Sequence, residues 1–107
     1  MFGPSPKRPK WDMKNKVVHK ACNCLKALAH ETRLGIIWLL RDGERNVNDL
    51  ASELEVSLSN ISQHLRILRD REILGTRKKG NQVFYRLNDP KILDIVEILR
   101  QLHCQAD

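Results

Sequence analysis

The chain has 107 residues, of which 41% are hydrophobic and 30% are charged, and its net charge is +6. That length suits one domain, and no apolar run is long enough to cross a bilayer. The three cysteines and the absence of a signal-peptide pattern argue against a disulfide scaffold and predict a cytoplasmic protein. The positive charge suits a polyanionic partner, although charge alone does not identify one.

The first half of the chain predicts an arm and two helices. Residues 1–12, MFGPSPKRPKWD, are rich in proline and basic side chains and predict a flexible arm, either solvated or touching DNA, ahead of a domain over residues 13–107. From about Met13 the periodicity indicates a helix with two apolar stripes, each of which holds a cysteine. A second helix is predicted over residues 31–41, where Gly35 suggests the close approach of another backbone.

Two further helices are predicted from their caps. Asn46 is a good N-cap for a short third helix, and Ser57 caps a fourth. Polar and basic residues occupy most faces of the fourth helix. Its apolar residues recur at helical spacing and predict one buried face, which is made by Leu58, Ile61, Leu65 and Leu68.

The C-terminal third predicts a hairpin and a last helix. Residues 76–87, TRKKGNQVFYRL, form two strand-like runs around Gly80-Asn81 and carry several cations. Pro90 opens a final helix with little polar surface. Because one small core cannot cover so apolar a helix, a second copy of the chain is its expected partner.

Two helices joined by a tight turn and followed by a cationic hairpin are the parts of a winged helix-turn-helix. The predicted fold is therefore mainly α with a small β-hairpin, namely five helices plus a two-stranded wing. A helix fits the major groove, and short polar or basic side chains read base edges or hold phosphates. No spacing typical of a catalytic triad or a phosphate-binding loop competes, so no enzyme activity is predicted.

The segments LKALAHETRLGIIWLL and SLSNISQHLRILRD, with the hairpin and the apolar tail, resemble the ArsR family of bacterial winged-helix repressors over roughly residues 25–104. The resemblance implies a homodimer, paired through the first and last helices, that binds operator DNA and releases it when an inducer arrives. This sequence departs from the family's pattern at Leu58, where many relatives carry Gln. The DNA-binding residues expected on the fourth helix and the hairpin are Ser57, Ser59, Asn60, Ser62, Gln63, His64, Arg66, Arg77, Lys78 and Lys79.

Alternatives stay open for parts of this interface. His64 either packs between the fourth helix and its neighbours or contacts a phosphate. The charged hairpin residues either bind DNA or are simply solvated. The whole domain could instead be a protein-interaction module without DNA binding, but a docking face of that kind would expose more apolar or aromatic anchors.

The family's metal sites are not expected here. Relatives that sense metal through the third helix carry Cys-Val-Cys at its start, where this chain has Asn46-Val47-Asn48, and amides are weak ligands for soft ions. A second family site, on the last helix, retains only Asp89 by alignment, while Lys91 stands at another ligand position. Zinc is therefore not predicted.

The cysteines allow two interpretations. Cys22 and Cys24 point about 200° apart on a helix and cannot chelate one ion, so each is either a small buried apolar residue or part of a thiol switch. Relatives that sense sulfane sulfur pair a tail cysteine with one in the second helix, where Trp38 stands here. A switch would need Cys104 of one subunit to meet Cys22 or Cys24 of the other, and arsenite, an oxidant or reactive sulfur would be its inducer.

Overall fold

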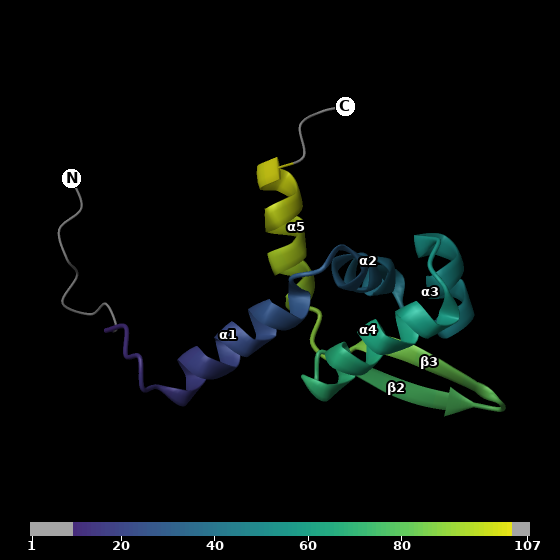
Figure 1. The fold of residues 1–107 in the computed structure, drawn as a ribbon, viewed down its shortest axis with the longest axis horizontal. Coiled ribbons are helices and arrows are strands. Elements are labelled where there is room, and N and C mark those ends of the chain that lie inside the picture. Colours follow the sequence, from purple (N-terminus) through teal and green to yellow (C-terminus); the bar gives the residue numbers. More distant parts are fainter. Residues whose placement is uncertain (1–9, 104–107) are drawn as a thin grey trace.

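The computed structural model describes residues 10–103, which form five α-helices and a small antiparallel sheet (Figure 1). The helices are α1 (Lys16–Leu28), α2 (Glu31–Leu39), α3 (Val47–Leu54), α4 (Leu58–Asp70) and α5 (Ile92–His103). The strands are β1 (Arg45–Asn46), β2 (Leu74–Lys79) and β3 (Gln82–Leu87). The mainly α architecture with a β-hairpin agrees with the prediction from the sequence.

The N-terminal boundaries differ from the prediction. Helix α1 begins at Lys16 rather than at Met13, because the Asn15 side chain accepts a hydrogen bond from the Val17 N–H at 2.7 Å and caps the helix there. Most of the predicted arm, residues 1–9, lies outside the described residues, and residues 10–12 are exposed. The division into a flexible arm and a domain therefore stays a prediction.

Side-chain caps start the three helices that follow. Asn46 Oδ1 accepts from the Asp49 N–H at 2.8 Å and Ser57 Oγ from the Asn60 N–H at 3.1 Å, so both predicted caps are confirmed. The cap of α2 was not predicted: His30 Nδ1 accepts from the Thr32 N–H at 3.0 Å. Helix α2 also ends earlier than expected, at Leu39, where a single 3₁₀ turn takes over.

The sheet has the strand order β1–β3–β2, with antiparallel pairing throughout. In the hairpin, Lys79 pairs with Gln82 across the two-residue turn at Gly80-Asn81, as predicted, and Gly80 adopts a φ of +61° that glycine tolerates well. Strand β1 was not predicted from the sequence. With only two residues, β1 is too short to show an alternating pattern in the sequence.

The core lies between α2, α3, α4 and the start of the hairpin. Leu58, predicted for the buried face of α4, is instead 52% exposed, and the prediction is wrong because the first three residues of α4, Leu58, Ser59 and Asn60, face solvent and the core begins at Ile61. The side chains with essentially no exposed surface are Ile36, Ile37, Leu50, Ile61, Leu65 and Leu68.

Gly35 does mark a close approach, but the neighbour is a side chain. A Cβ at this position would lie 2.7 Å from Leu54 Cδ2 of α3, and no backbone atom is among the nearest groups. Because Gly35 has no side chain, Leu54 packs directly against the backbone of α2 at this position.

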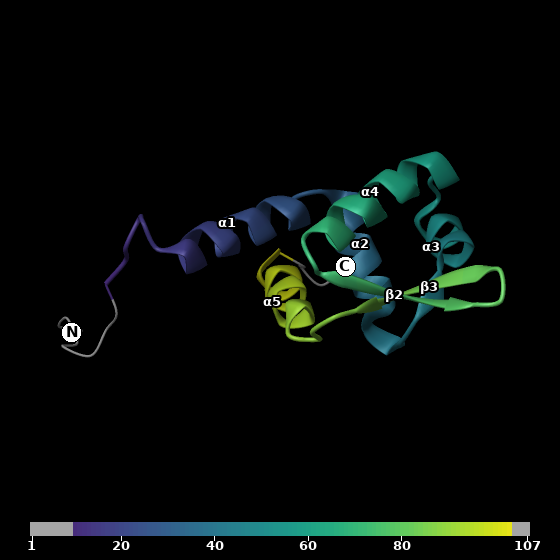
Figure 2. The ribbon, with the colours of Figure 1, turned by 90° about the horizontal axis from the view of Figure 1, so that it is seen from below.

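The two ends of the molecule differ in character. The N-terminal half of α4 and the tip of the hairpin extend toward one end, and α1 projects from the other (Figures 1 and 2). In α1 only Ala27 and Leu28 are buried. Helix α5 packs against α2 and buries Val96. None of the helices within residues 10–103 has the length and apolar character needed to span a bilayer.

Candidate nucleic-acid interface

Helix α4 presents a polar face opposite its buried one. Ile61, Leu65 and Leu68 point into the core. Because successive residues of a helix are rotated by about 100°, the side chains between them point in other directions around the helix axis. The exposed polar and basic side chains of its first three turns are Ser59, Asn60, Ser62, Gln63 and Arg66. These five predicted residues therefore lie together on a solvent-facing surface that a nucleic acid can reach.

Ser57 serves the helix itself. Its Oγ accepts the Asn60 N–H at 3.1 Å and lies 3.2 Å from the Ser59 hydroxyl oxygen. The hydroxyl thus satisfies one of the amide groups that have no partner within the first turn. Its place at the end of α4 nevertheless keeps it beside the exposed polar face.

His64 is half-buried at the edge of the core stripe. Its Nδ1 lies 3.1 Å from Arg33 Nη1, and its ring centroid lies 4.2 Å from that of His30. Burial, followed by the electrostatic effects of His30 and Arg33, lowers the pKa of His64 from its ordinary value. His64 of α4 is therefore packed against α2, and the expected contact with a phosphate stays a prediction.

The three predicted cations of the wing divide into two kinds. Arg77 forms an ion pair with Glu44, with Nη2 2.7 Å from Oε1, and its guanidinium also lies 5.4 Å from the centre of the Phe84 ring. The hydrogen bond from Arg77 lowers the pKa of the Glu44 carboxyl. Lys78 and Lys79, farther along β2, are exposed and form no ion pair within the described part of the chain.

A hollow of about 260 Å³ is lined by residues of the start of α3, of the hairpin and, from α4, by Ser62. Ser62 shares this hollow with the amide side chains of Asn46 and Asn48 at the start of α3 and of Asn81 at the hairpin turn. The Asn46 amide donates to Gln82 Oε1 at 3.4 Å and so links the start of α3 to the wing. The sequence analysis did not assign these amides to the interface, because they come from three separate segments with no shared spacing.

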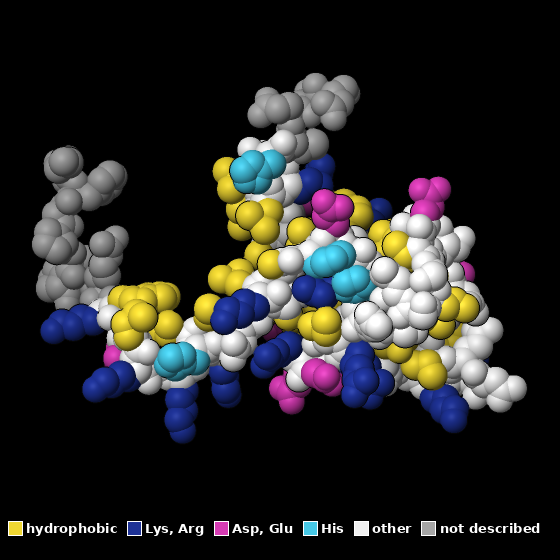
Figure 3. Space-filling model, in the orientation of Figure 1, with side chains coloured by type: hydrophobic (Ala, Val, Ile, Leu, Met, Phe, Trp, Pro, Cys, Tyr) yellow, Lys and Arg dark blue, Asp and Glu magenta, His cyan; other side chains and the backbone are white. Residues whose placement is uncertain are grey.

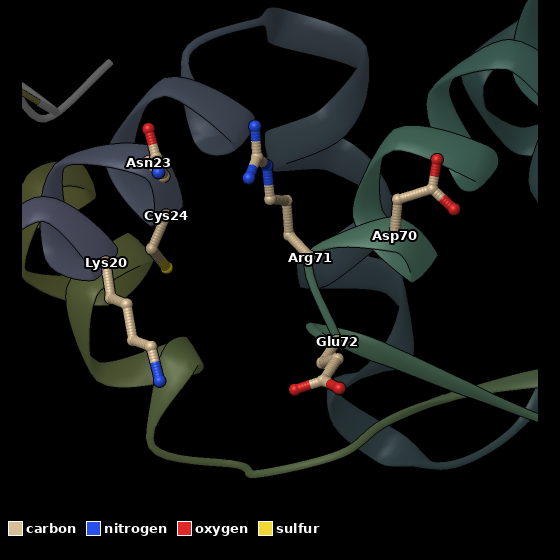
Figure 4. Close-up of a pocket in the computed structure, with 6 residues that line it drawn as sticks. All are labelled: Lys20, Asn23, Cys24, Asp70, Arg71 and Glu72. Atoms are coloured by element: carbon tan, nitrogen blue, oxygen red, sulfur yellow. The ribbon is translucent and has the colours of Figure 1, made fainter. Parts of the chain in front are cut away.

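Cys22 and Cys24 occupy different surroundings. Cys22 is exposed, so its interpretation as a buried apolar residue is wrong for the single chain. Cys24 is half-buried, and its sulfur faces a hollow of about 230 Å³ between α1 and the end of α4 (Figure 4). The other residues around this hollow are Lys20, Asn23, Asp70, Arg71 and Glu72. Cys104 lies outside the described residues.

Asn46, which stands where metal-sensing relatives carry the first Cys of Cys-Val-Cys, has a structural role. The Asn46 side chain is engaged as the helix cap and in the contact with Gln82. Over residues 10–103 no three His, Cys, Asp or Glu side chains come together in a group that could hold a metal ion.

Comparison with known proteins gives a consistent family. Residues 30–74 match the model described as bacterial regulatory protein, arsR family. The transcriptional activator HlyU of Vibrio cholerae is 44% identical over 88 residues, which are 82% of each chain. A crystal structure of the repressor BigR from Xylella fastidiosa matches with a TM-score of 0.77 and 33% identity, over 84% of this chain and 92% of that one.

A third match is to a domain described as homodimeric. A homodimeric winged helix-turn-helix DNA-binding domain from Mycobacterium bovis, described as a possible ArsR-family transcriptional regulator, has a TM-score of 0.75 and 25% identity, over 92% of this chain and 95% of that one. The observed fold, the matched segment and the identity to HlyU over 82% of each chain agree. The chain belongs to the arsR family of bacterial regulatory proteins.

Proposed function

We propose that this chain is a transcriptional regulator, not an enzyme, that binds operator DNA as a homodimer and represses until an inducer releases it. The observation that carries the proposal is the exposed polar face of α4 together with Lys78 and Lys79 on the adjacent wing. Side chains such as Gln63 and Asn60 have donors and acceptors for base edges in the major groove, and the lysines suit phosphates. The family membership supports the same function.

The apolar residues of α4 do not favour a protein-docking role. Leu58 and Ile67 are the exposed large hydrophobic side chains of this helix. They are nine residues apart, which at about 100° per residue places them on opposite sides of the cylinder. They therefore form no continuous apolar anchor of the kind that a protein interface would need.

The proposed dimer surface lies on α1 and α5. Apolar side chains follow α5 along the face seen in Figure 3, with Ile98 56% and Leu102 65% exposed, and Val17 of α1 is 70% exposed. So much exposed apolar surface on two helices is typical of an interface between subunits. The homodimeric relative from Mycobacterium bovis supports a second copy of this chain as the partner.

Selection of bound duplexes from a random library, combined with light scattering, tests this function. We expect an inverted repeat whose half-sites are about one helical turn apart, and a protein mass of two chains. The affinity should fall steeply with salt, because bound phosphates release counterions. A stable monomer that binds all duplexes equally would overturn the proposal.

We further propose that the inducer acts on thiols. Cys104 of one subunit would meet Cys22 or Cys24 of the other, forming either a site for a thiophilic ion such as arsenite or a disulfide made by an oxidant or reactive sulfur. The exposure of Cys22 and the open hollow at Cys24 support access of such reagents to α1. A change at the dimer interface would alter the spacing of the two α4 helices and so release DNA.

The thiol hypothesis is tested by operator affinity with and without arsenite or a mild oxidant, for wild type and Cys104→Ser. We expect the wild type to lose affinity under at least one treatment and the variant to keep it. If the wild type is unaffected by both treatments, or if the variant responds as the wild type does, the cysteines are not the sensor.

A further inference from the structure

One arginine joins three helices beside the candidate interface. Arg33 belongs to α2, and its Nε donates to the Ala27 carbonyl oxygen of α1 at 2.6 Å. Its Nη1 lies 3.1 Å from Nδ1 of His64 on α4. A single guanidinium thus holds the end of α1 and the middle of α4 at fixed positions relative to α2.

Both contacts use the chemistry of arginine. The Ala27 carbonyl is among the last four of α1, which have no acceptor role within their own helix, and a cation at a helix C-terminus is favourable. Arg33 forms no ion pair within residues 10–103, so its charge is directed at a carbonyl oxygen and an imidazole. Lysine could not reproduce this geometry, because its ammonium is a point charge without the planar fork.

The contact with Arg33 also fixes the state of His64. A guanidinium only donates hydrogen bonds, so Nδ1 of His64 must accept and its proton must sit on Nε2. Protonation would place a second N–H opposite Nη1 and remove the bond. In the described part of the chain, the titratable or charged groups that face His64 are Arg33 and His30, and both disfavour a cationic ring.

We propose that Arg33 is a positioning residue for DNA recognition. It holds neutral His64 as an anchor of α4, and it ties that anchor to the end of α1, the helix that carries Cys22 and Cys24. His64 then supports the exposed face of α4 and does not itself touch DNA. The inference rests on the proposed DNA-binding function.

The expected effects follow from which bonds each variant keeps. His64→Asn retains an acceptor near the position of Nδ1 and should keep operator affinity within about threefold, whereas His64→Leu removes it and should lose about 10- to 100-fold. Arg33→Lys should lose operator affinity by a similar factor. Adding His64→Leu to Arg33→Lys should cost little further affinity, since the bond between the two residues is already lost. Arg69→Ala, which removes another cation of α4, one that is exposed, is the charge control.

A pH profile separates anchoring from direct contact with DNA. If His64 is an anchor, acidification from about pH 7.5 to about pH 5.5 weakens wild-type binding more than that of His64→Asn. If His64 touches a phosphate, acid strengthens wild-type binding relative to the variant, and His64→Asn loses affinity at neutral pH. Either of these two results would overturn the inference.

A measurement without DNA keeps this inference distinct from the function it rests on. Nitrogen chemical shifts of the His64 ring should report an unprotonated Nδ1 in the wild type at neutral pH, and Arg33→Lys should lose this preference. A ring that prefers the other tautomer in the wild type contradicts the proposed anchor. Failure of the wild type to bind any duplex, with this tautomer observed, would instead refute DNA binding and leave the Arg33 contact standing.

Discussion

Arg77 of β2 and Glu44, the residue before β1, are joined by three short contacts. Arg77 Nη2 lies 2.7 Å from Glu44 Oε1, and Arg77 Nε lies 2.9 Å from the same oxygen and 3.1 Å from Oε2. The first cation of the wing is thus held by a carboxylate at the base of the hairpin. Lys78 and Lys79, in contrast, are exposed and form no ion pair within the described residues.

Replacing the partner of Arg77 should strengthen binding to DNA in general. Glu44→Gln removes the ion pair and frees the guanidinium, so we expect higher affinity for specific and nonspecific duplexes and a salt slope steeper by about one. Binding isotherms at several salt concentrations measure this. Glu53→Gln, which removes the carboxylate paired with Arg45 at 2.8 Å, is the matched control and should change affinity less. Equal effects of the two variants would argue against a DNA role for Arg77.

Lys79→Ala should weaken binding to all sequences alike. Lys79 is exposed next to the hairpin turn and suits a phosphate contact, which carries no sequence information. We expect the salt slope to fall in magnitude by about one, with no change in the ratio of specific to nonspecific affinity. A change in that ratio alone would assign this lysine to base recognition.

Gln63→Ala should reduce sequence preference. The Gln63 side chain is exposed opposite the buried stripe of α4, where it has donors and acceptors for a base edge. We expect a loss of about 1 to 3 kcal/mol for the preferred operator and little loss for unrelated DNA. Competition experiments with operator variants measure the difference, and a uniform loss would point to a backbone contact.

The two ends of the apolar stripe on α4 should differ in stability. Leu65 has almost no exposed surface, so Leu65→Ala should lower the free energy of unfolding by about 2 to 5 kcal/mol. Leu58 is 52% exposed, and Leu58→Ala should cost less than about 1 kcal/mol. Urea denaturation measures both. Similar losses for the two variants would mean that the first turn of α4 is packed in solution.

The lowered pKa of His64 predicts a pH-dependent contribution to stability. Because the folded state disfavours protonation, the unfolded chain takes up the proton at higher pH, and acid favours unfolding. The contribution is fully present above the ordinary histidine pKa and is lost as pH falls through the lowered folded value. We therefore expect the unfolding free energy of the wild type, relative to that of His64→Asn, to decrease on acidification, as measured by denaturation at a series of pH values.

Local signals in the sequence predicted the elements well. Asn46 and Ser57 start their helices through their own side chains, and Gly80 allows the hairpin turn, so short-range chemistry was sufficient at these points. The exposed polar face of α4 followed from helical periodicity in the same way. The exposure of Leu58 did not, since periodicity indicates which face is apolar but not how far along the helix the core extends.

The contacts that complete the site come from long range. Arg77 meets Glu44 from 33 residues away, and Arg33 meets His64 from 31 residues away. Neither pair has a spacing that periodicity can detect, because the distance along the chain is set by the loops and the hairpin between them. The lowered pKa of His64 is likewise a property of its packed surroundings and not of its neighbours in sequence.

We expect the helical order of α1 to depend on the concentration of the protein. Because only Ala27 and Leu28 of this helix are buried within one chain, contacts within that chain do little to stabilise the preceding turns of α1. In the proposed dimer, association supplies the missing contacts, so mass action links the order of α1 to protein concentration. Dilution would then remove helicity from α1 and the two-fold arrangement of the two α4 helices together, and the abundance of the protein in the cell would itself control operator occupancy.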